Sequence, residues 1–197
     1  MAAPSIEEVV AAAQRMTGEI EQVPPMVSAV KVDGRRLHEL AREGREVHRS
    51  PRPVTVTRFE VAATPDPMVF DAVVDCSSGT YVRVLAADLG SALGGGAHLS
   101  RLRRTAVGPF GIGESHPLES PELLAPEEIT RVLAVLRVDG GTAREVVHGN
   151  VMERESLGVH SGDRGPWAVL DAGGHLLAVY EAHRGASVKP SMVFAVA

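Results

Sequence analysis

Apolar residues near the N-terminus recur at the spacing of an amphipathic helix. The positions are Ile6, Val9, Val10, Ala13 and Met16. Ser5 precedes them and Glu8 follows it three residues later, which is the pattern of a capping box. The sequence therefore predicts a helix that begins after Ser5 and ends before Gly18.

Two further segments have helical periodicity. Leu37, Leu40 and Ala41 predict a short helix that ends at Gly44. A longer helix is predicted by the apolar positions Val82, Leu85, Ala86, Leu89 and Leu93. The glycines at 94–96 follow this helix and free the chain to turn back.

Other segments alternate between apolar and polar residues with the period of two that is typical of strands. Residues 54–62 and 70–76 do so on either side of a Pro-Asp-Pro turn, which predicts an antiparallel hairpin. After two prolines that hold the chain extended, residues 26–31 are predicted to form a short strand that ends at a turn at 33–34.

The C-terminal third predicts a small β-rich module. Residues 167–171 and 175–180 are apolar runs joined through Gly-Gly, which predicts a hairpin, and residues 189–196 predict a third strand. Before this module, residues 114–128 are acidic and contain three prolines, which is typical of a linker with a short helix.

Composition limits the class of protein. The chain has 197 residues, 44% of them hydrophobic and 23% charged, with a net charge of -5. These values are those of a folded protein, and the negative total excludes one that coats nucleic acid indiscriminately. The single cysteine, Cys76, excludes an internal disulfide and a cysteine-based zinc cluster. With no secretory signal in the sequence, we expect a reducing, cytoplasmic location.

Residues 31–58 form a basic segment within this acidic chain. The segment has eight basic and four acidic side chains, a local charge of +4. Such a charge suits a phosphate backbone. A solvated surface with intrahelical ion pairs such as Glu39 with Arg42 also explains it, and the segment alone favours that second interpretation.

Tyr81 and Arg83 stand at the start of the predicted helix 82–93 without a place on its apolar face. The tyrosine ring could stack on a base, and the guanidinium could hold a carboxylate or a phosphate. Spacing alone favours the alternative, a tyrosine packed on the core and a surface arginine.

Residues 99–110 are predicted to be extended, with Arg101 and Arg103 on one face of a strand and Leu102 and Arg104 on the other. A strand with cations on both faces fits a polyanion, and it fits an exposed edge strand protected by charge equally well. The histidines show no metal-ligand spacing, and the glycines after the long helix lack the Lys of a phosphate-binding loop.

Taken in order, these segments resemble the bacterial tRNA pseudouridine synthase B (TruB) family, whose members isomerise a uridine in the T-loop of tRNA. The matching segments are 22–31, 34–44, 52–54, 76–83, 88–90 and 96–104. The resemblance extends from about Ile6 to Leu118, and the ordered set is far more specific than any one piece. The C-terminal hairpin resembles, more weakly, the small PUA-like or actinobacterial-type domain that follows the catalytic domain in this family.

The resemblance implies an α+β fold, with part of the mixed or antiparallel pseudouridine-synthase sheet, flanking helices and then a small β-rich PUA-like domain. The implied domains are a catalytic portion at 1–118, a linker at 119–134 and the small domain at 135–197. The implied partner is tRNA, without a membrane, a metal or an organic cofactor, and we expect a monomer.

The resemblance also implies roles for individual residues. Tyr81 matches the active-site tyrosine, Arg83 the arginine that pairs with the catalytic aspartate, and Leu102 the apolar residue of the uridine pocket. Candidates for holding the surrounding phosphates are Lys31, Arg35, Arg36, Arg103 and Arg104.

One departure from the family is large. Members carry an upstream Gly-Thr/Ala-Leu-Asp-Pro motif with the nucleophilic aspartate, and no such motif occurs in these 197 residues. Asp88 matches a different position, for which a structural role is the simpler interpretation. We therefore expect the C-terminal part of a longer synthase, inactive by itself, with an unpaired sheet edge. The rival hypothesis is a non-catalytic module that holds tRNA or another RNA with the same basic residues.

Overall fold

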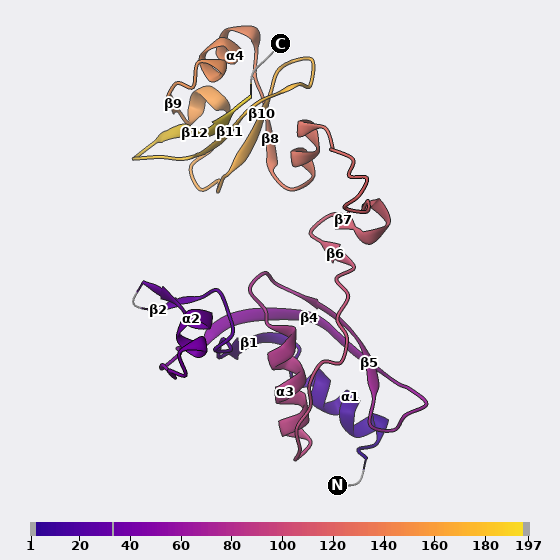
Figure 1. Cartoon of the computed structure of the whole chain (residues 1–197). Helices are drawn as coiled ribbons and strands as arrows, with labels where there is room; N and C mark the ends of the chain where they lie inside the picture. Colours follow the sequence, from indigo (N-terminus) through magenta and orange to yellow (C-terminus); the bar gives the residue numbers. More distant parts are fainter. Residues whose placement is uncertain (1–2, 33, 195–197) are drawn as a thin grey trace. The chain divides into compact units, whose positions relative to one another are not determined.

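The computed structural model describes residues 3–32 and 34–194, and the chain divides into two compact units between Leu102 and Arg103 (Figure 1). The elements of the first unit are α1 (Ile6–Gln14), β1 (Gly18–Gln22), β2 (Lys31–Val32), β3 (Arg35–Arg36), α2 (Leu37–Arg42), β4 (Arg52–Ala63), β5 (Phe70–Cys76) and α3 (Val82–Ala92). Strands β1, β4 and β5 form an antiparallel sheet with β4 in the centre, and the outer edges of β1 and β5 have no strand partner among the described residues.

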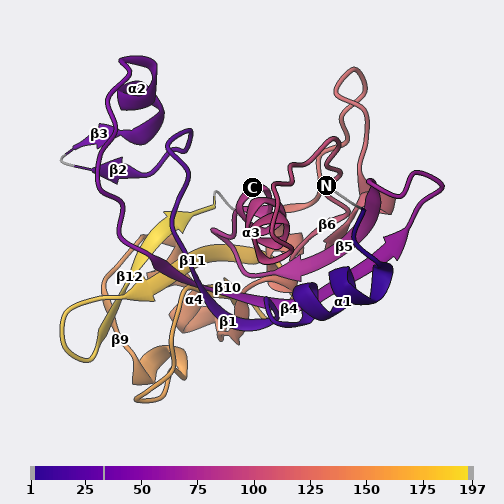
Figure 2. The same ribbon diagram turned by 90° about the horizontal axis from the view of Figure 1, so that it is seen from below.

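Helix α1 packs against β4 through its buried side chains Val9, Ala12 and Ala13. Its N-terminus has the predicted capping box, because the Glu8 amide donates to Ser5 Oγ at 3.2 Å and the Ser5 amide donates to Glu8 Oε2 at 2.8 Å. Figure 2 shows α1 lying along the sheet.

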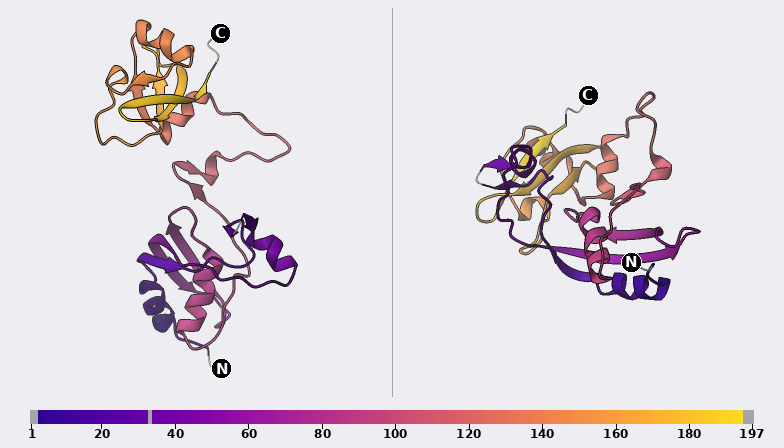
Figure 3. Two further views of the ribbon diagram at one scale, coloured as in Figure 1. Left: turned by 90° about the vertical axis from the view of Figure 1, so that its left-hand side faces the viewer. Right: turned by 60° about the horizontal axis from the view of Figure 1, so that its bottom comes forward.

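Strands β2 and β3 pair with each other, and helix α2 follows them directly. Figures 2 and 3 draw these elements as an arm beside the three-stranded sheet, joined to it through residues 23–30 and 43–51. In α2, Leu37 and Leu40 are buried, whereas the charged residues of the arm are exposed. The basic residues of the arm are therefore presented to solvent.

The second unit contains a five-stranded sheet with the order β8-β10-β11-β12-β9. Its elements are β6 (Ala106–Val107), β7 (Phe110–Gly111), η1 (Ile112–Glu114), η2 (Pro126–Arg131), β8 (Ala134–Arg137), α4 (Gly140–Val147), β9 (Met152–Glu153), η3 (Glu155–Leu157), β10 (Trp167–Leu170), β11 (Leu176–Ala182) and β12 (Ser187–Val193). Strand β8 runs parallel to β10, and the other pairs are antiparallel.

Strands β10 and β11 place apolar side chains on both faces of this sheet, and each face is covered by another element. On one face Trp167 and Tyr180 pack with Val146 of α4. On the other face Ala168 packs with Ile129 of η2. These strands are consequently almost continuous apolar runs, as expected for strands that are buried on both sides.

Much of the predicted secondary structure is confirmed. The three predicted helices correspond to α1, α2 and α3, the predicted hairpin to β4 and β5, and the C-terminal strands to β10, β11 and β12. The predicted end of the last strand extends past residue 194, and the predicted turn includes Asp33; both lie outside the described residues. The predicted domain boundaries after residues 118 and 134 stay a prediction.

Two strand predictions are wrong. Residues 26–29 form bends, residue 30 has no regular structure, and only 31–32 are a strand. Residues 99–105 have no regular structure, and a strand begins only at Ala106. In the first case the backbone carbonyls accept hydrogen bonds from groups other than a neighbouring strand. The side chain of Arg49 donates to Pro24 and that of Arg83 to Val27. Backbone amides at the start of α2 donate to the carbonyls of Ser28 and Val30. In the second case the alternation does not reflect burial, because every residue from 101 to 109 is exposed.

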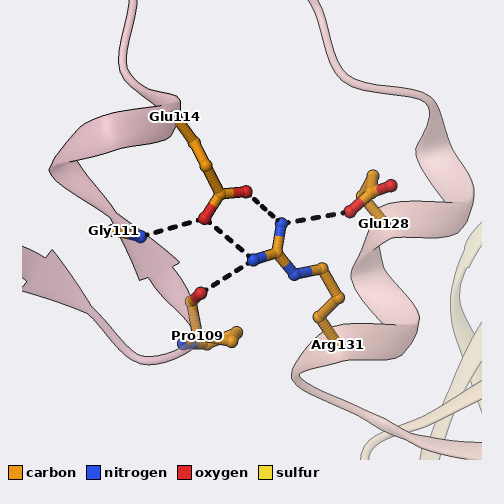
Figure 4. Close-up of polar contacts among 5 residues, drawn as sticks. All are labelled: Pro109, Gly111, Glu114, Glu128 and Arg131. Carbon is orange, nitrogen blue, oxygen red and sulfur yellow. Dashed lines mark hydrogen bonds and ion pairs between the residues drawn. The ribbon is translucent and has the colours of Figure 1, made fainter.

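A network around Arg131 joins the predicted linker 119–134 to the chain that precedes it (Figure 4). The Arg131 guanidinium donates to both Glu114 carboxylate oxygens, at 2.6 and 3.0 Å, and to the Pro109 carbonyl at 2.7 Å. It lies 4.4 Å from the centre of the Phe110 ring, a cation–π distance. Glu128 adds a second carboxylate at 3.3 Å. This network closes the base of a loop from 115 to 125.

We predict that the Glu114 carboxyl titrates far below the usual range. Arg131 and then the Gly111 amide lower the pKa of Glu114 from 4.5 to about 2. Because the folded-state pKa is depressed, the stabilisation is present above about pH 4.5 and is lost as the pH falls toward 2. NMR titration of the side-chain carboxyl carbon measures this pKa, and Arg131→Gln should return it toward 4.5. A midpoint near 4.5 in the unmodified protein would contradict the network.

Candidate functional site

The turn before α3 fixes the position of Tyr81, which is the N-cap residue of that helix. Gly79 has φ +84°, which a residue with a side chain rarely adopts. The Ser77 amide donates to the Thr55 carbonyl at 2.8 Å, and the Thr55 amide donates to Ser77 Oγ at 2.9 Å. The start of α3 is thus tied to the central strand of the sheet.

Gln22 also contacts Tyr81, and sequence reasoning gave this glutamine no role of its own. The Tyr81 amide donates to Gln22 Oε1 at 2.9 Å, and Gln22 Nε2 donates to the Tyr81 carbonyl at 3.4 Å. The glutamine is 2% exposed at the end of β1. Its place at the start of the matching segment 22–31 is the only signal the sequence offers.

Arg83 lies in the first turn of α3 with an exposed side chain. One of its nitrogens donates to the Val27 carbonyl at 3.1 Å. Within residues 3–32 and 34–194, no carboxylate is at ion-pair distance from it. A guanidinium has five N–H donors, so most of the Arg83 donors stay available to another group.

Leu102 ends the first unit, in the irregular segment after α3. Its side chain is 66% exposed, so this chain does not enclose it in a packed pocket. The structure therefore places Tyr81 and Arg83 together at the start of one helix, whereas the part of Leu102 in a uridine pocket stays a prediction.

Lys31 and Arg36 face each other across the β2–β3 pair, and both are exposed. Like charges directly opposite each other on two strands are destabilising. Neither side chain has an ion-pair partner in the described part of the chain. An anion bound between them would relieve this repulsion.

Arg35 differs from these two residues because it forms an ion pair with Glu43 of the same arm. The pair raises the pKa of the Arg35 guanidinium and lowers the pKa of the Glu43 carboxyl. Elsewhere in the basic segment, Arg58 pairs with Asp75 at 2.8 Å. Both interpretations of the segment thus hold in part, since some arginines are neutralised locally and others are not.

Arg103 and Arg104 begin the second unit and are exposed in the irregular segment 99–105. The expected arrangement of arginines on the two faces of a strand is therefore incorrect. Neither arginine forms an ion pair within the described ranges. Both guanidinium groups are exposed without a strand, so they could still bind a polyanion.

Nothing in the described part of the chain gathers three or more His, Cys, Asp or Glu side chains into a group that could hold a metal ion. No helix in the same ranges combines the length and the apolar character that crossing a bilayer requires.

Solved structures share this fold. A Cbf5-Nop10-Gar1 complex contains a chain that matches 98% of this one with a TM-score of 0.70 at 24% identity, over 63% of its own length. An H/ACA RNP bound to a substrate RNA containing 2'-deoxyuridine contains a chain that matches with a TM-score of 0.68 at 21% identity. At these identities the likeness shows the fold, which is α+β as predicted.

Curated proteins match at higher identity. A protein named tRNA pseudouridine synthase B from Corynebacterium aurimucosum is 45% identical over an alignment of 175 positions, which covers 84% of this chain and 57% of that protein. One of the same name from Mycobacterium tuberculosis is 41% identical over an alignment of 182 positions, which covers 89% of this chain and 60% of the relative. The chain therefore spans less than two thirds of the length of these relatives.

Two family models match consecutive parts of the chain. The model of the TruB family pseudouridylate synthase N-terminal domain matches residues 1–82, and that of the tRNA pseudouridylate synthase B C-terminal domain matches residues 83–131. The junction of the two models falls between Tyr81 and Arg83, at the end of the matching segment 76–83. With the fold and the relatives in agreement, the chain belongs to the TruB family of pseudouridine synthases.

Proposed function

We propose that this chain supplies part of the uridine pocket and part of the tRNA contacts of a tRNA pseudouridine synthase. The observation that carries the proposal is the start of α3, where Tyr81 is fixed from β1 and β4 and the Arg83 guanidinium is exposed, with no carboxylate partner among the described residues. A base flipped out of a folded RNA loop loses its stacking, and an aromatic ring in the pocket can replace it. A tRNA substrate also agrees with the expected cytoplasmic location.

The proposed reaction needs a group that these residues do not supply. Isomerisation breaks the bond between C1′ of the ribose and N1 of uracil and forms a bond from C1′ to C5, while C5 loses its proton and N1 gains one. A carboxylate in the pocket promotes the breaking and the remaking of the bond to C1′. In our proposal Arg83 orients that carboxylate, and Tyr81 holds the base. Because the Gly-Thr/Ala-Leu-Asp-Pro motif is absent from these 197 residues, the residues alone bind and orient without reacting.

We predict that the 197-residue chain forms no detectable pseudouridine in a T-stem-loop RNA. The measurement is mass spectrometry of nucleosides after incubation of the chain with the RNA, with a complete TruB-family synthase as the positive control. Product formation would contradict the proposal that the reacting carboxylate lies elsewhere. Asp88→Asn is the variant to examine in that event, because Asp88 is an exposed carboxylate on α3.

We predict that the same RNA binds through phosphate contacts at Lys31, Arg36, Arg103 and Arg104. Replacing Arg103 and Arg104 with alanine should weaken binding and lower the slope of log K against log salt by about 2, about 1 for each contact. Fluorescence anisotropy at several salt concentrations measures both quantities.

The matched control is the double substitution Arg164→Ala with Arg184→Ala, which removes the same charge from exposed positions that have no proposed contact. Equal losses in the two double variants would show that binding depends on total charge only, and the proposed contacts would be wrong. Binding without product would support both parts of the proposal, and it is also the behaviour of the non-catalytic RNA-binding module.

A further inference from the structure

The side-chain amide of Gln22 contacts the backbone of Tyr81 on both sides of the residue. The carboxamide oxygen accepts from the Tyr81 amide at 2.9 Å, and the carboxamide nitrogen donates to the Tyr81 carbonyl at 3.4 Å. An amide side chain thus makes the pair of hydrogen bonds that a neighbouring strand would make. A primary amide offers a donor and an acceptor on one planar group, and a protonated glutamate offers the same pair on a side chain of the same length.

These contacts lie at a point where α3 lacks a cap of its own. Tyr81 is the N-cap residue, and its side chain makes no capping hydrogen bond. Its carbonyl accepts from the amides of Val84 and Leu85 at 2.9 and 3.1 Å, so it already belongs to the first turn. By holding that carbonyl and the amide of the same residue, Gln22 fixes the direction in which the helix leaves the sheet.

The buried position of Gln22 makes the contacts specific. The residue is 2% exposed, so water cannot freely replace a lost partner, and a buried polar group without a partner is strongly disfavoured. Tyr81 and Arg83 lie on the turn that this glutamine holds, and Arg83 in turn contacts the Val27 carbonyl in the loop that follows Gln22.

We propose that Gln22 is a positioning residue that sets Tyr81, and through the first turn of α3 also Arg83, in the orientation that the uridine pocket requires. The inference rests on the proposed function for the meaning of that orientation, whereas the hydrogen bonds themselves can be tested without RNA. Gln22 does not touch substrate in this proposal, and it acts only through Tyr81.

The first test is amide hydrogen exchange at Tyr81, measured by NMR on the 197-residue chain. Gln22→Met keeps the volume and removes both hydrogen bonds, and it should raise the exchange rate of the Tyr81 amide at least about tenfold. The amides of β4 and β5 should keep their protection, which verifies the fold. Unchanged protection at Tyr81 would overturn the proposal.

The second test uses Gln22→Glu, because a protonated glutamate can make both hydrogen bonds and an ionised one can only accept. Burial raises the pKa of such a carboxyl above its usual value. The Tyr81 amide keeps its acceptor in both states, whereas the hydrogen bond to the Tyr81 carbonyl exists only while the glutamate is protonated. The ¹³C chemical shift of the Tyr81 carbonyl should therefore be close to that of the unmodified protein in acid and depart from it as the glutamate ionises. A purely volume-filling role would give no such pH profile, and a flat profile would overturn the proposal even if Gln22→Met fails to fold.

Ser77→Ala is the matched control, because it removes the other side chain that ties this turn to the sheet. The Thr55 amide, which donates to Ser77 Oγ, should lose protection, and the Tyr81 amide should keep it. Loss of protection at Tyr81 in this variant as well would show that any damage to the turn releases Tyr81, and a specific role for Gln22 would be wrong.

The third test links the contact to the pocket. A T-stem-loop RNA with 5-fluorouridine at the target position reports the environment of the base by its ¹⁹F shift. Gln22→Met should bind this RNA within about twofold of the unmodified affinity but lose the bound-state shift, as Tyr81→Leu should. A normal bound-state shift would overturn the effect on the pocket. If the unmodified chain does not bind the RNA, the proposed function fails, while the exchange results still decide the Gln22 contact.

Discussion

Replacing Gly90 with alanine is expected to destabilise the first unit by about 1–3 kcal/mol, the usual cost of overpacking. Gly90 is buried in α3. A Cβ atom there would lie 2.3 Å from the Ala97 nitrogen and 2.6 Å from the Gly96 carbonyl carbon, both of which are backbone atoms. Helix propensity alone predicts the opposite sign, a stabilisation of about 1 kcal/mol. The sign of the change therefore tests whether the chain returns against α3.

Gly96→Ala is the matched control for this substitution. It lies in the same returning segment, is exposed, and a Cβ atom there meets nothing within 4 Å. Its effect on the free energy of unfolding should stay within about 0.5 kcal/mol. Hydrogen exchange of amides in α3 and β4 measures the stability of the first unit in both variants. A stabilised Gly90→Ala protein would show that the return of the chain against α3 is wrong.

Tyr180→Ala is expected to destabilise the second unit by about 3–5 kcal/mol, as for other large aromatic residues in a core. Tyr180 is fully buried in β11, directly opposite Trp167 of β10. Its hydroxyl donates to the Asn150 carbonyl at 2.9 Å. Tyr180→Phe keeps the ring and should cost only about 1 kcal/mol, the net value of one hydrogen bond.

The measurement for these variants is urea unfolding followed by the fluorescence of Trp167, the single tryptophan of the chain. Because Trp167 lies in the core of the second unit, its signal reports the unfolding of that unit. Met192→Ala is the control, since Met192 lies on β12 with an exposed side chain and should change stability by less than about 0.5 kcal/mol. Equal effects of Tyr180→Ala and Tyr180→Phe would contradict the packing of the ring.

The sequence predicted elements whose periodicity comes from burial, and one strand that a turn signal marks. Helix α1 and strand β4 have buried apolar positions. Strand β5 has no buried residue, and its prediction rests on alternation and on the Pro-Asp-Pro turn that joins it to β4. The segment 99–105 alternates as well, but its pattern comes from arginines in solvent and has no partner strand among the described residues. Periodicity cannot distinguish these cases, because it records residue types and not their surroundings.

The sequence predicted some residues of the candidate site and missed others. Tyr81 and Arg83 were identified from a motif, and the structure places them on one turn. The motif gave no role to Gln22, because its partner is a backbone amide far along the chain, and backbone partners leave no mark on sequence. The pairing of Arg35 with Glu43 was missed for a related reason, since their contact depends on how β3 and α2 meet.

Proteolytic cleavage in the loop closed by Arg131 would turn a contact within the chain into a contact between two fragments. Leu118 and Leu123 on this loop are 93% and 97% exposed, which makes its backbone accessible to proteases. A cut there would leave Glu114 on one fragment and Arg131 on the other, so that their contact becomes an association between molecules. Its strength would then be set by the concentration of the fragments and no longer by the high effective concentration that a covalent tether provides.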